Sequence, residues 1–322
     1  MAFTTLIDAH ALLELSVSPN PNLVLLDCRF DLGKPQAGHL AYLNGHIPGA
    51  HFADLNTDLS AAVGPKTGRH PLPDPQAFAA NLASWGVHPG SQVVVYDELN
   101  GSFAARAWWL LRWVGHPAVA VLDGGYKTWL AAGGPTAAGE EGRVPHPLHE
   151  SPASATVDSD AVLDAAQVMA LLHDPKRLLV DARAAERYAG TVEPIDAVAG
   201  HVVGAVNHPF AGNLTADGRF LPPEQLRQRW AAELDGRSAA DVVAMCGSGV
   251  TACHNLLSLE VAGLHGAKLY AGSWSRRPTA AGPFAPSRRR APGFRTPRRR
   301  CATRPGAAAH GQGQQPAAVP RR

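Results

Sequence analysis

The stretch Asp241 to Leu264, DVVAMCGSGVTACHNLLSLEVAGL, combines a short apolar run, a cysteine, a turn with two glycines and a helical pattern. Residues 242–245 are typical of a buried strand in a parallel sheet, because so short an apolar run bounded by a turn suits a strand better than a helix. The apolar residues of 250–262 recur at helical spacing until Gly263 provides a stop. The pattern therefore places the thiol of Cys246 at the end of a strand and over the start of a helix.

The start of a helix favours a thiolate over a thiol, because unpaired amide N–H groups and the positive end of the helix dipole both attract negative charge. We therefore expect Cys246 to be nucleophilic at neutral pH. The spacing alone leaves an alternative open, which is an inert buried cysteine, the commonest state of a free cysteine.

Length and composition favour a two-domain globular enzyme. The chain has 322 residues, which exceeds the size at which a single core usually stops growing. Hydrophobic residues make up 45% of it, and no stretch approaches the roughly 20 apolar residues of a membrane span. The N-terminus carries Asp8 and Glu14 and lacks a basic segment, so we expect no signal peptide, no membrane association and a cytoplasmic location.

The four cysteines do not form a recognisable metal or disulfide pattern. Cys28, Cys246, Cys253 and Cys301 contain neither a CxxC pair nor metal-ligand spacing, and four cysteines in so long a chain are no disulfide framework. We expect reduced thiols, no bound metal and no cofactor.

Strands and helices alternate in the first half of the chain. The pattern predicts strands at 22–27, 92–96 and 119–122, and helices at 5–16, 75–85, 103–114 and after Gly125. Proline and two glycines exclude regular structure from GHIPGA at 45–50. The alternation predicts an α/β fold with a doubly wound, mainly parallel sheet flanked by helices.

The same pattern then begins again. After a predicted helix at 162–172, residues 177–183 (RLLVDAR) repeat the NLVLLDCR strand, and residues 200–205 (GHVVGA) repeat GHIPGA. We interpret this as an internal duplication. It predicts two tandem domains at 1–135 and 158–275, a linker at 136–157 and a tail at 276–322.

The duplication aligns Cys246 with an aspartate. The interval from the strand aspartate to the following loop is 70 residues from Asp27 to Asp97, and 65 residues from Asp181 to Cys246. A purely structural core residue would be matched by another apolar residue rather than by a carboxylate. The comparison favours a reactive role for Cys246.

The repeated motifs resemble those of a known family. With VDAR at 180–183, GHVVGA at 200–205, CGSGVTA at 246–252 and an upstream copy, the chain resembles the two-domain rhodanese-like sulfurtransferases over about residues 5–275. The CGSGVT loop is more similar to that of 3-mercaptopyruvate sulfurtransferases than to that of thiosulfate enzymes, whose loop carries basic side chains. The resemblance implies two rhodanese-like domains, of which the N-terminal one, with Asp97, is catalytically silent.

The resemblance also implies a ping-pong sulfur transfer. Cys246 takes sulfur from 3-mercaptopyruvate or thiosulfate, becomes a persulfide and passes the outer sulfur to a thiol acceptor such as thioredoxin, or to cyanide. The backbone amides of the loop are expected to hold the anionic persulfide and the substrate, through Gly247, Gly249, Val250 and Thr251. Ser248 is a candidate proton relay and Thr251 a candidate helix cap, with ordinary turn and cap roles as the alternative.

An arginine is expected to anchor the donor. Arg187, in AAERYAGT, matches the substrate-binding arginine of the family, and its planar donor fork suits a carboxylate or sulfonate. The alternative is a solvated surface arginine. Family members carry a second arginine after a Glu-Pro pair, whereas Glu193 and Pro194 are followed here by Ile195. The preferred donor therefore stays open.

A histidine of the first domain is the remaining catalytic candidate. His70, in GRHPLP, resembles the family histidine that joins the active-site serine across the domain cleft. The resemblance implies an acidic partner near residues 54–58, where Asp54 and Asp58 are both candidates and we choose Asp58. The alternative is that Asn56 occupies the position of the family's aspartate. Asp181 and Arg183 are expected to brace the loop rather than react.

The tail differs in composition from the rest of the chain. Residues 276–322 contain 12 Arg and no Asp, Glu or Lys, so the preceding residues carry 17 basic and all 27 acidic side chains. We predict that this Arg- and Pro-rich tail is disordered. Because family members continue there with an acidic residue and tryptophan, we hypothesise a shifted reading frame. Binding of nucleic acid by the arginine clusters is the alternative, which we do not expect because no folded module accompanies them.

Two other functions compete with sulfur transfer. A cysteine phosphatase needs an arginine six residues after the nucleophile, and that position is Ala252. A noncatalytic persulfide carrier or binding module requires the same reactive thiol. Only a measurement of turnover distinguishes such a protein from an enzyme.

Overall fold

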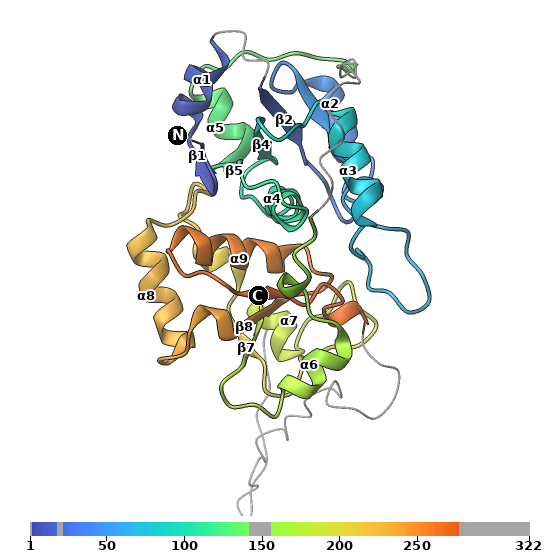
Figure 1. The fold of residues 1–322 in the computed structure, drawn as a ribbon, viewed down its shortest axis with the longest axis vertical. Helices are drawn as coiled ribbons and strands as arrows, with labels where there is room; N and C mark the ends of the chain where they lie inside the picture. Colours follow the sequence, from blue (N-terminus) through green and yellow to red (C-terminus); the bar gives the residue numbers. More distant parts are fainter. Residues whose placement is uncertain (1, 18–21, 142–155, 277–322) are drawn as a thin grey trace, which may run out of the picture. The chain divides into compact units, whose positions relative to one another are not determined.

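The computed structural model describes residues 2–17, 22–141 and 156–276 of the chain (Figure 1). We call residues up to 141 the N-terminal half and residues from 156 the C-terminal half. The predicted tail, apart from Arg276, and most of the predicted linker lie outside the described residues. None of the helices in the described ranges has the length and apolar character needed to cross a membrane.

The N-terminal half contains a five-stranded sheet in the order β1-β5-β4-β2-β3, in which all neighbours are parallel. Its strands are β1 (Leu6–Ile7), β2 (Leu23–Asp27), β3 (Ala50–Phe52), β4 (Gln92–Tyr96) and β5 (Val119–Leu122). The predicted strands at 92–96 and 119–122 are confirmed, and the strand predicted at 22–27 begins one residue later. The sheet is therefore parallel throughout, as the alternating pattern predicted.

The C-terminal half contains a four-stranded parallel sheet in the order β7-β6-β8-β9. Its strands are β6 (Leu178–Asp181), β7 (Val206–Asn207), β8 (Val242–Met245) and β9 (Lys268–Leu269). They take the places of β2, β3, β4 and β5 in the first sheet. A parallel bridge between Val162 and Leu269 corresponds to the pairing of β1 with β5. The two halves share one topology, in agreement with the predicted duplication.

Helices connect the strands in both halves. They are α1 (Ala9–Ser16), α2 (Ala37–Asn44), α3 (Pro75–Ser84), α4 (Ala104–Trp113), α5 (Gly125–Ala131), α6 (Ala165–Leu171), α7 (Ala185–Ala189), α8 (Pro223–Leu234) and α9 (Thr251–Val261). Short 3-10 helices are η1 (Ser159–Ala161), η2 (Phe210–Asn213), η3 (Ala239–Asp241) and η4 (Trp274–Arg276). The sequence analysis did not predict α2, α7 and α8.

The strands bury alternate side chains on opposite faces of each sheet. In β4, Val93 and Val95 join the cluster that contains α3 and α4, whereas Val94 and Tyr96 join the cluster that contains α1 and α5. In the C-terminal half α8 and α9 pack on one face and α6 packs on the other. Helix α4 contacts α9, and a single apolar cluster includes both helices (Figure 1).

A buried ion pair braces the end of β6. Arg183 places Nη2 2.7 Å from Oδ2 of Asp181 and also donates a hydrogen bond to the carbonyl oxygen of Gly200 at 2.8 Å. Its guanidinium lies 5.0 Å from the ring centroid of Trp274. Both charged side chains are at most 1% exposed. The bracing role expected for Asp181 and Arg183 agrees with these contacts.

The N-terminal half repeats this arrangement at the end of β2. Arg29 lies 2.6 Å from Asp27, donates to the carbonyl oxygen of Gly45 at 2.6 Å and stands 4.5 Å from the ring centroid of Tyr126. The aromatic ring next to the arginine also has an equivalent, although the residue differs. Tyr126 takes the place of Trp274. Equivalent strand ends are therefore fixed by equivalent contacts.

Three predicted boundaries need correction. Residues 5–16 do not form one helix, because Leu6 and Ile7 pair with β5 and the Asp8 side chain caps α1 by accepting from Ala11 N–H. The segment at 45–50 is partly regular, since His46 forms a bridge with Ala137 and Ala50 begins β3. The helix expected at 162–172 begins only at Ala165.

We predict that Asp181→Ala lowers the free energy of unfolding by about 3–5 kcal/mol, because the variant leaves the Arg183 guanidinium buried without its carboxylate. Urea unfolding followed by circular dichroism measures the change. The matched control is Asp217→Ala, whose side chain is 64% exposed and pairs with Arg219, with an expected change below about 0.5 kcal/mol. Equal effects of the two substitutions would contradict the bracing role.

Candidate active site

Cys246 follows β8 directly and is 2% exposed. The N–H of Gly249 donates a hydrogen bond to its Sγ at 3.1 Å. Gly249 has a φ of +83°, and a Cβ on it would lie 2.6 Å from the carbonyl oxygen of Ala271. A side chain at this position would therefore be both strained and blocked, so the turn that brings an amide to the sulfur requires glycine.

The segment that follows β9 holds the active-site loop from outside. Backbone N–H groups of Trp274 and Ser275 donate to the carbonyl oxygens of Cys246 and Gly247 at 3.0 and 2.8 Å. The N–H of Cys246 donates to Oγ of Ser273 at 3.0 Å. Because these backbone groups already have partners outside the loop, the turn keeps its shape around the sulfur.

The equivalent loop of the N-terminal half surrounds a buried carboxylate with backbone N–H groups. The carboxylate of Asp97 accepts hydrogen bonds from the N–H groups of Leu99, Gly101, Phe103 and Ala104 at 2.9 to 3.2 Å. Burial raises the pKa of the Asp97 carboxyl, and these four N–H groups oppose the shift. A turn of this design therefore holds negative charge at the end of the central strand. The same place in the C-terminal half is taken by Sγ of Cys246.

His70 reaches the active-site loop from the N-terminal half. Its Nδ1 lies 2.7 Å from Oγ of Ser248, and both side chains are 5% exposed. Burial and the charges of Arg106 and Arg69 lower the pKa of His70 to about 4. The imidazole is therefore neutral at pH 7 and shares one hydrogen bond with the serine hydroxyl. His70 and Ser248 are thus in contact, as the family resemblance led us to expect.

Arg106 joins the two halves beneath the loop. The side chain is fully buried, and its guanidinium donates to the carbonyl oxygens of Leu59, His70 and Pro71 in the N-terminal half and of Gly249 in the C-terminal half, at 3.3 to 3.4 Å. No carboxylate pairs with it among the described residues. Burial lowers the pKa of Arg106, while the nearby Cys253 and Cys246 thiols act in the opposite direction.

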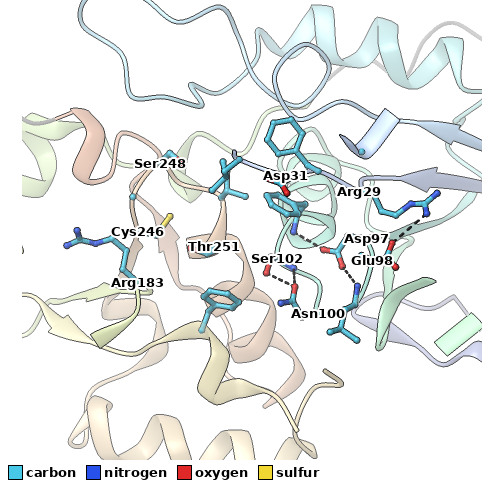
Figure 2. A pocket seen from close by; sticks show the side chains of 18 of the residues that line it. Arg29, Asp31, Asp97, Glu98, Asn100, Ser102, Arg183, Cys246, Ser248 and Thr251 are labelled. Atoms are coloured by element: carbon cyan, nitrogen blue, oxygen red, sulfur yellow. Dashed lines mark hydrogen bonds and ion pairs between the residues drawn. The ribbon is translucent and has the colours of Figure 1, made fainter. Parts of the chain in front are cut away.

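A cavity of about 540 Å³ opens above Cys246 and is lined by both halves. Figure 2 shows Cys246 and Ser248 on the loop after β8, Thr251 at the start of α9, and Asp97, Asn100 and Ser102 on the loop after β4. The aromatic lining side chains are Phe30, Phe103 and Phe210. The cavity is large enough for a small organic substrate, and its base contains the sulfur.

Arg187 also lines this cavity, at the C-terminal half. Its Nη2 lies 2.8 Å from Glu193 and 2.9 Å from Asp196, so it is a fixed rather than a freely solvated arginine. Ile195, which stands where the resemblance led us to look for a second arginine, is 43% exposed and does not line the cavity. Arg187 thus lines the cavity and Ile195 does not, and the anchoring role of Arg187 stays a prediction.

Most of the predicted site residues come together. Cys246, Ser248 and Arg187 line the cavity, as do three residues of the loop, Gly247, Val250 and Thr251. Gly249 supplies the N–H that reaches the sulfur. Thr251 does not cap the helix, because α9 begins at Thr251 itself and Val250 is the N-cap residue, without a side-chain hydrogen bond.

Asp58 lies elsewhere. Its carboxylate accepts a hydrogen bond from the N–H of Asp54 at 2.8 Å and lines a separate cavity with His51 and Trp85. The side chain of His70 is hydrogen-bonded to Ser248, and the charges that shift its pKa are those of arginines. The pairing of Asp58 with His70 stays a prediction.

The sequence analysis missed two arginines. Arg69 precedes His70 and lines the cavity, and Arg106 lies beneath the loop. Arg106 had a signal, because it is a lone charge in the apolar run AARAWWLL of a predicted helix. Arg69 had none, since an arginine beside a histidine in a loop resembles any surface residue.

Comparisons with known proteins identify the family of the chain. The chain matches the rhodanese-like domain family at residues 8–132 and again at 164–276. It is 53% identical over 270 residues to a probable 3-mercaptopyruvate sulfurtransferase of Pseudomonas aeruginosa, covering 81% of this chain and 93% of that protein. It is 35% identical over 261 residues to thiosulfate sulfurtransferase of Bos taurus, covering 79% of this chain and 84% of that protein. The crystal structure of SseA from Escherichia coli, described with the rhodanese fold of 3-mercaptopyruvate sulfotransferases, matches 85% of this chain and 100% of its own, with a TM-score of 0.71 and 32% identity.

We predict that the free energy of unfolding falls as the pH drops below about 6.5. The pKa of His70 is lowered to about 4 and that of His254 to about 3, chiefly by burial, so the unfolded chain binds these protons first. This stabilisation is fully present above the unfolded pKa and is lost as the pH falls through the folded values. Each histidine should cost about 1–2 kcal/mol between about pH 6.5 and 5.

Urea unfolding at a series of pH values measures this loss. The variant His254→Phe should reduce the slope, because it removes a titrating ring that stacks on Phe220 and whose Nδ1 has no hydrogen-bond partner in the described part of the chain. A free energy of unfolding that stays constant between about pH 6.5 and 5 would contradict the lowered pKa values of the two histidines.

Proposed function

The chain belongs to the rhodanese-like sulfurtransferases, and from this premise we propose that it transfers the sulfur of 3-mercaptopyruvate through a persulfide on Cys246 to a thiol or cyanide acceptor. The two halves, with proposed bounds 1–135 and 158–275, divide the work. The N-terminal half supplies His70 and a wall of the cavity, and the C-terminal half supplies the nucleophile.

The hydrogen bond from Gly249 N–H to the Cys246 sulfur carries this proposal. An amide aimed at a thiol sulfur stabilises negative charge on it, and the same turn in the N-terminal half surrounds the Asp97 carboxylate with four N–H groups. A persulfide is an anion of this kind. The loop thus suits both the attacking thiolate and the sulfur-loaded intermediate.

The first step transfers one sulfur atom. The Cys246 thiolate attacks the thiol sulfur of 3-mercaptopyruvate, an S–S bond forms, and the C–S bond breaks with its electron pair moving into the enolate of pyruvate. The proton of the donor thiol ends on the methyl carbon, so the products are pyruvate and the Cys246 persulfide anion. An acceptor thiolate then attacks the outer sulfur and releases the Cys246 thiolate.

Ser248 and His70 are suited to moving that proton. The hydroxyl of Ser248 both donates and accepts hydrogen bonds, and the neutral His70 ring lies 2.7 Å from it. A pair that is uncharged at pH 7 accepts the thiol proton and returns it without building a stable charge in the buried site. We propose that this pair protonates the enolate.

Arg187 is proposed to bind the carboxylate of the donor, since its guanidinium lines the cavity above the loop. Thiosulfate is the second candidate donor, because the chain is also 35% identical to a thiosulfate sulfurtransferase. The active-site loop 246–251 contains no lysine or arginine to meet a sulfonate, which favours mercaptopyruvate. Thioredoxin as the acceptor and a cytoplasmic location stay predictions from the sequence.

We predict that Cys246→Ser lowers thiocyanate formation from 3-mercaptopyruvate and cyanide by at least about a thousandfold, because a serine hydroxyl is not ionised at neutral pH. Mass spectrometry should show one added sulfur on Cys246 in the unmodified chain after treatment with donor alone. The control Cys28→Ala alters a buried thiol that does not line the cavity and should keep its activity. Persulfide formation without turnover by either donor would instead indicate a carrier.

Ser248→Ala is expected to lower kcat by about a hundredfold, the usual size of a general acid–base contribution, and His70→Asn by a similar factor. Because the two side chains act through one hydrogen bond, the double variant should be no slower than the slower single variant. Stopped-flow measurement of pyruvate release gives the three rates. Effects that multiply in the double variant would show that the residues act independently.

A further inference from the structure

The cavity above Cys246 has room for more than the donor. Its volume of about 540 Å³ lies within the range of roughly 300–1,000 Å³ that encloses drug-sized ligands, whereas the proposed donor is a short keto acid. Cys246 is 2% exposed at the base of the cavity, so an acceptor must bring its own sulfur into the cavity to reach a persulfide. The walls beyond the donor are therefore in contact with the acceptor during the second step.

The loops after β2 and β4 contribute an apolar wall to this cavity. Four of their side chains are apolar lining residues, namely Phe30, Leu32, Leu99 and Phe103. The rings of Phe30 and Phe103 meet edge to face, with centroids 5.5 Å apart. Such a wall packs well against the methylene groups of a small organic thiol.

The same two loops are acidic. Their charged lining residues are Arg29, Asp31, Asp97 and Glu98, so among the described residues of these loops one lining cation faces three carboxyl groups (Figure 2). The cation is already committed, because Arg29 pairs with Asp27 at 2.6 Å and with Glu98 at 3.6 Å. Once Arg29 and Asp27 are counted together, Asp31 and Glu98 remain as net negative charge.

Both of these carboxylates are open to the solvent. The Glu98 side chain is 69% exposed. Asp31 is exposed as well, and its Oδ1 accepts hydrogen bonds from the backbone N–H groups of Gly33 and Lys34 at 2.7 and 3.1 Å, which fixes the direction of the carboxylate. The Lys34 side chain does not line the cavity. Exposed charges act over about 10 Å at 0.1 M salt, so both carboxylates act on an ion that enters.

The opposite side of the cavity has no such excess of charge. Three arginines there are matched by three carboxylates, in ion pairs that join Arg69, Arg183 and Arg187 with Asp181, Glu193 and Asp196. An anionic donor is therefore not repelled on that side. An anion placed against the loops after β2 and β4 meets two uncompensated carboxylates.

We propose that the loops after β2 and β4 form the acceptor side of the cavity and select a small thiol with a positive charge near its sulfur over an anionic thiol. Asp31 and Glu98 provide the selection, and the apolar wall packs against the methylene groups of the acceptor. This assignment rests on the proposed sulfur transfer and narrows its acceptor class to small aminothiols.

The step itself exchanges one sulfur–sulfur bond for another. The acceptor thiol loses its proton to water, and its sulfur forms a bond to the outer sulfur of the Cys246 persulfide. The bond between that outer sulfur and Sγ of Cys246 breaks, and its electron pair stays on Sγ. The positive group of the acceptor then lies beside the carboxylates of Asp31 and Glu98.

The first test needs no sulfur transfer. 2-Aminoethyl methanethiosulfonate and 2-sulfonatoethyl methanethiosulfonate share one reactive group and differ in the charge of the attached group. The Cys246 thiolate attacks the sulfur that bears this group, forms a mixed disulfide and releases methanesulfinate. The attached group then takes the place proposed for the acceptor. Mass spectrometry of the Cys246 peptide gives both rates.

The ratio of the ammonium rate to the sulfonate rate should fall by about threefold in Asp31→Asn and in Glu98→Gln, and by about tenfold in the double variant. The matched control is Asp217→Asn, which removes one charge from a side chain that is 64% exposed and does not line the cavity. Its ratio should equal that of the unmodified chain.

Salt provides an independent check on the unmodified chain. At about 1 M salt the Debye length is about 3 Å, so its ratio should approach that of the double variant. A ratio that the double substitution leaves unchanged overturns the proposal, as does a ratio that Asp217→Asn lowers equally.

Acceptor kinetics connect the selection to sulfur transfer. With saturating 3-mercaptopyruvate, kcat/KM is measured for cysteamine and for 3-mercaptopropionate, each expressed per thiolate. The ratio of these two values should fall by about tenfold in the double variant, whereas kcat/KM for the donor should stay within about twofold. An effect on the donor alone contradicts the acceptor role. If no donor is turned over but the methanethiosulfonate ratio falls as expected, the charge selection stands and the proposed function fails.

Discussion

A carboxylate at the end of a strand, bound by an arginine two residues later, fixes the frame on which this molecule depends. The same guanidinium also holds the carbonyl oxygen of a glycine in the following loop, Gly45 in one half and Gly200 in the other. Both ion pairs are buried, so their worth lies in geometry as much as in stability. They fix where the chain leaves the sheet, and the active-site cavity opens at that edge.

The two loops that follow the central strands are variations on one anion-binding turn. In the N-terminal half the carboxylate of Asp97 accepts hydrogen bonds from the amides, whereas in the C-terminal half the amide of Gly249 donates to the sulfur of Cys246. The difference between a structural loop and a reactive one is therefore the chemistry of a single side chain. In the proposed reaction, the hydrogen-bonded pair of Ser248 and His70 moves the proton.

Local patterns predicted the parts of the fold that local physics determines. The run 242–245 and the glycines after Cys246 specified a strand and a turn, and the structure has β8 there with the same bounds. Residues 5–16 were misassigned because an apolar pair next to a capped helix has the same composition as one more helical turn. Contacts between the halves left no local trace, so Arg69 was missed, and Asp58 was chosen by proximity in sequence although it belongs to another cavity.

Arg106 makes the two halves of the duplicated fold depend on each other. Its guanidinium donates to carbonyl groups of both halves, including that of Gly249 in the loop after β8, so each half provides part of the surroundings of this buried cation. The N-terminal half, which carries Asp97 in place of the cysteine, is therefore needed for structure. Without it, the loop after β8 would lose its hydrogen bond from the Arg106 guanidinium. The two halves of the duplicated fold therefore depend on each other for structure.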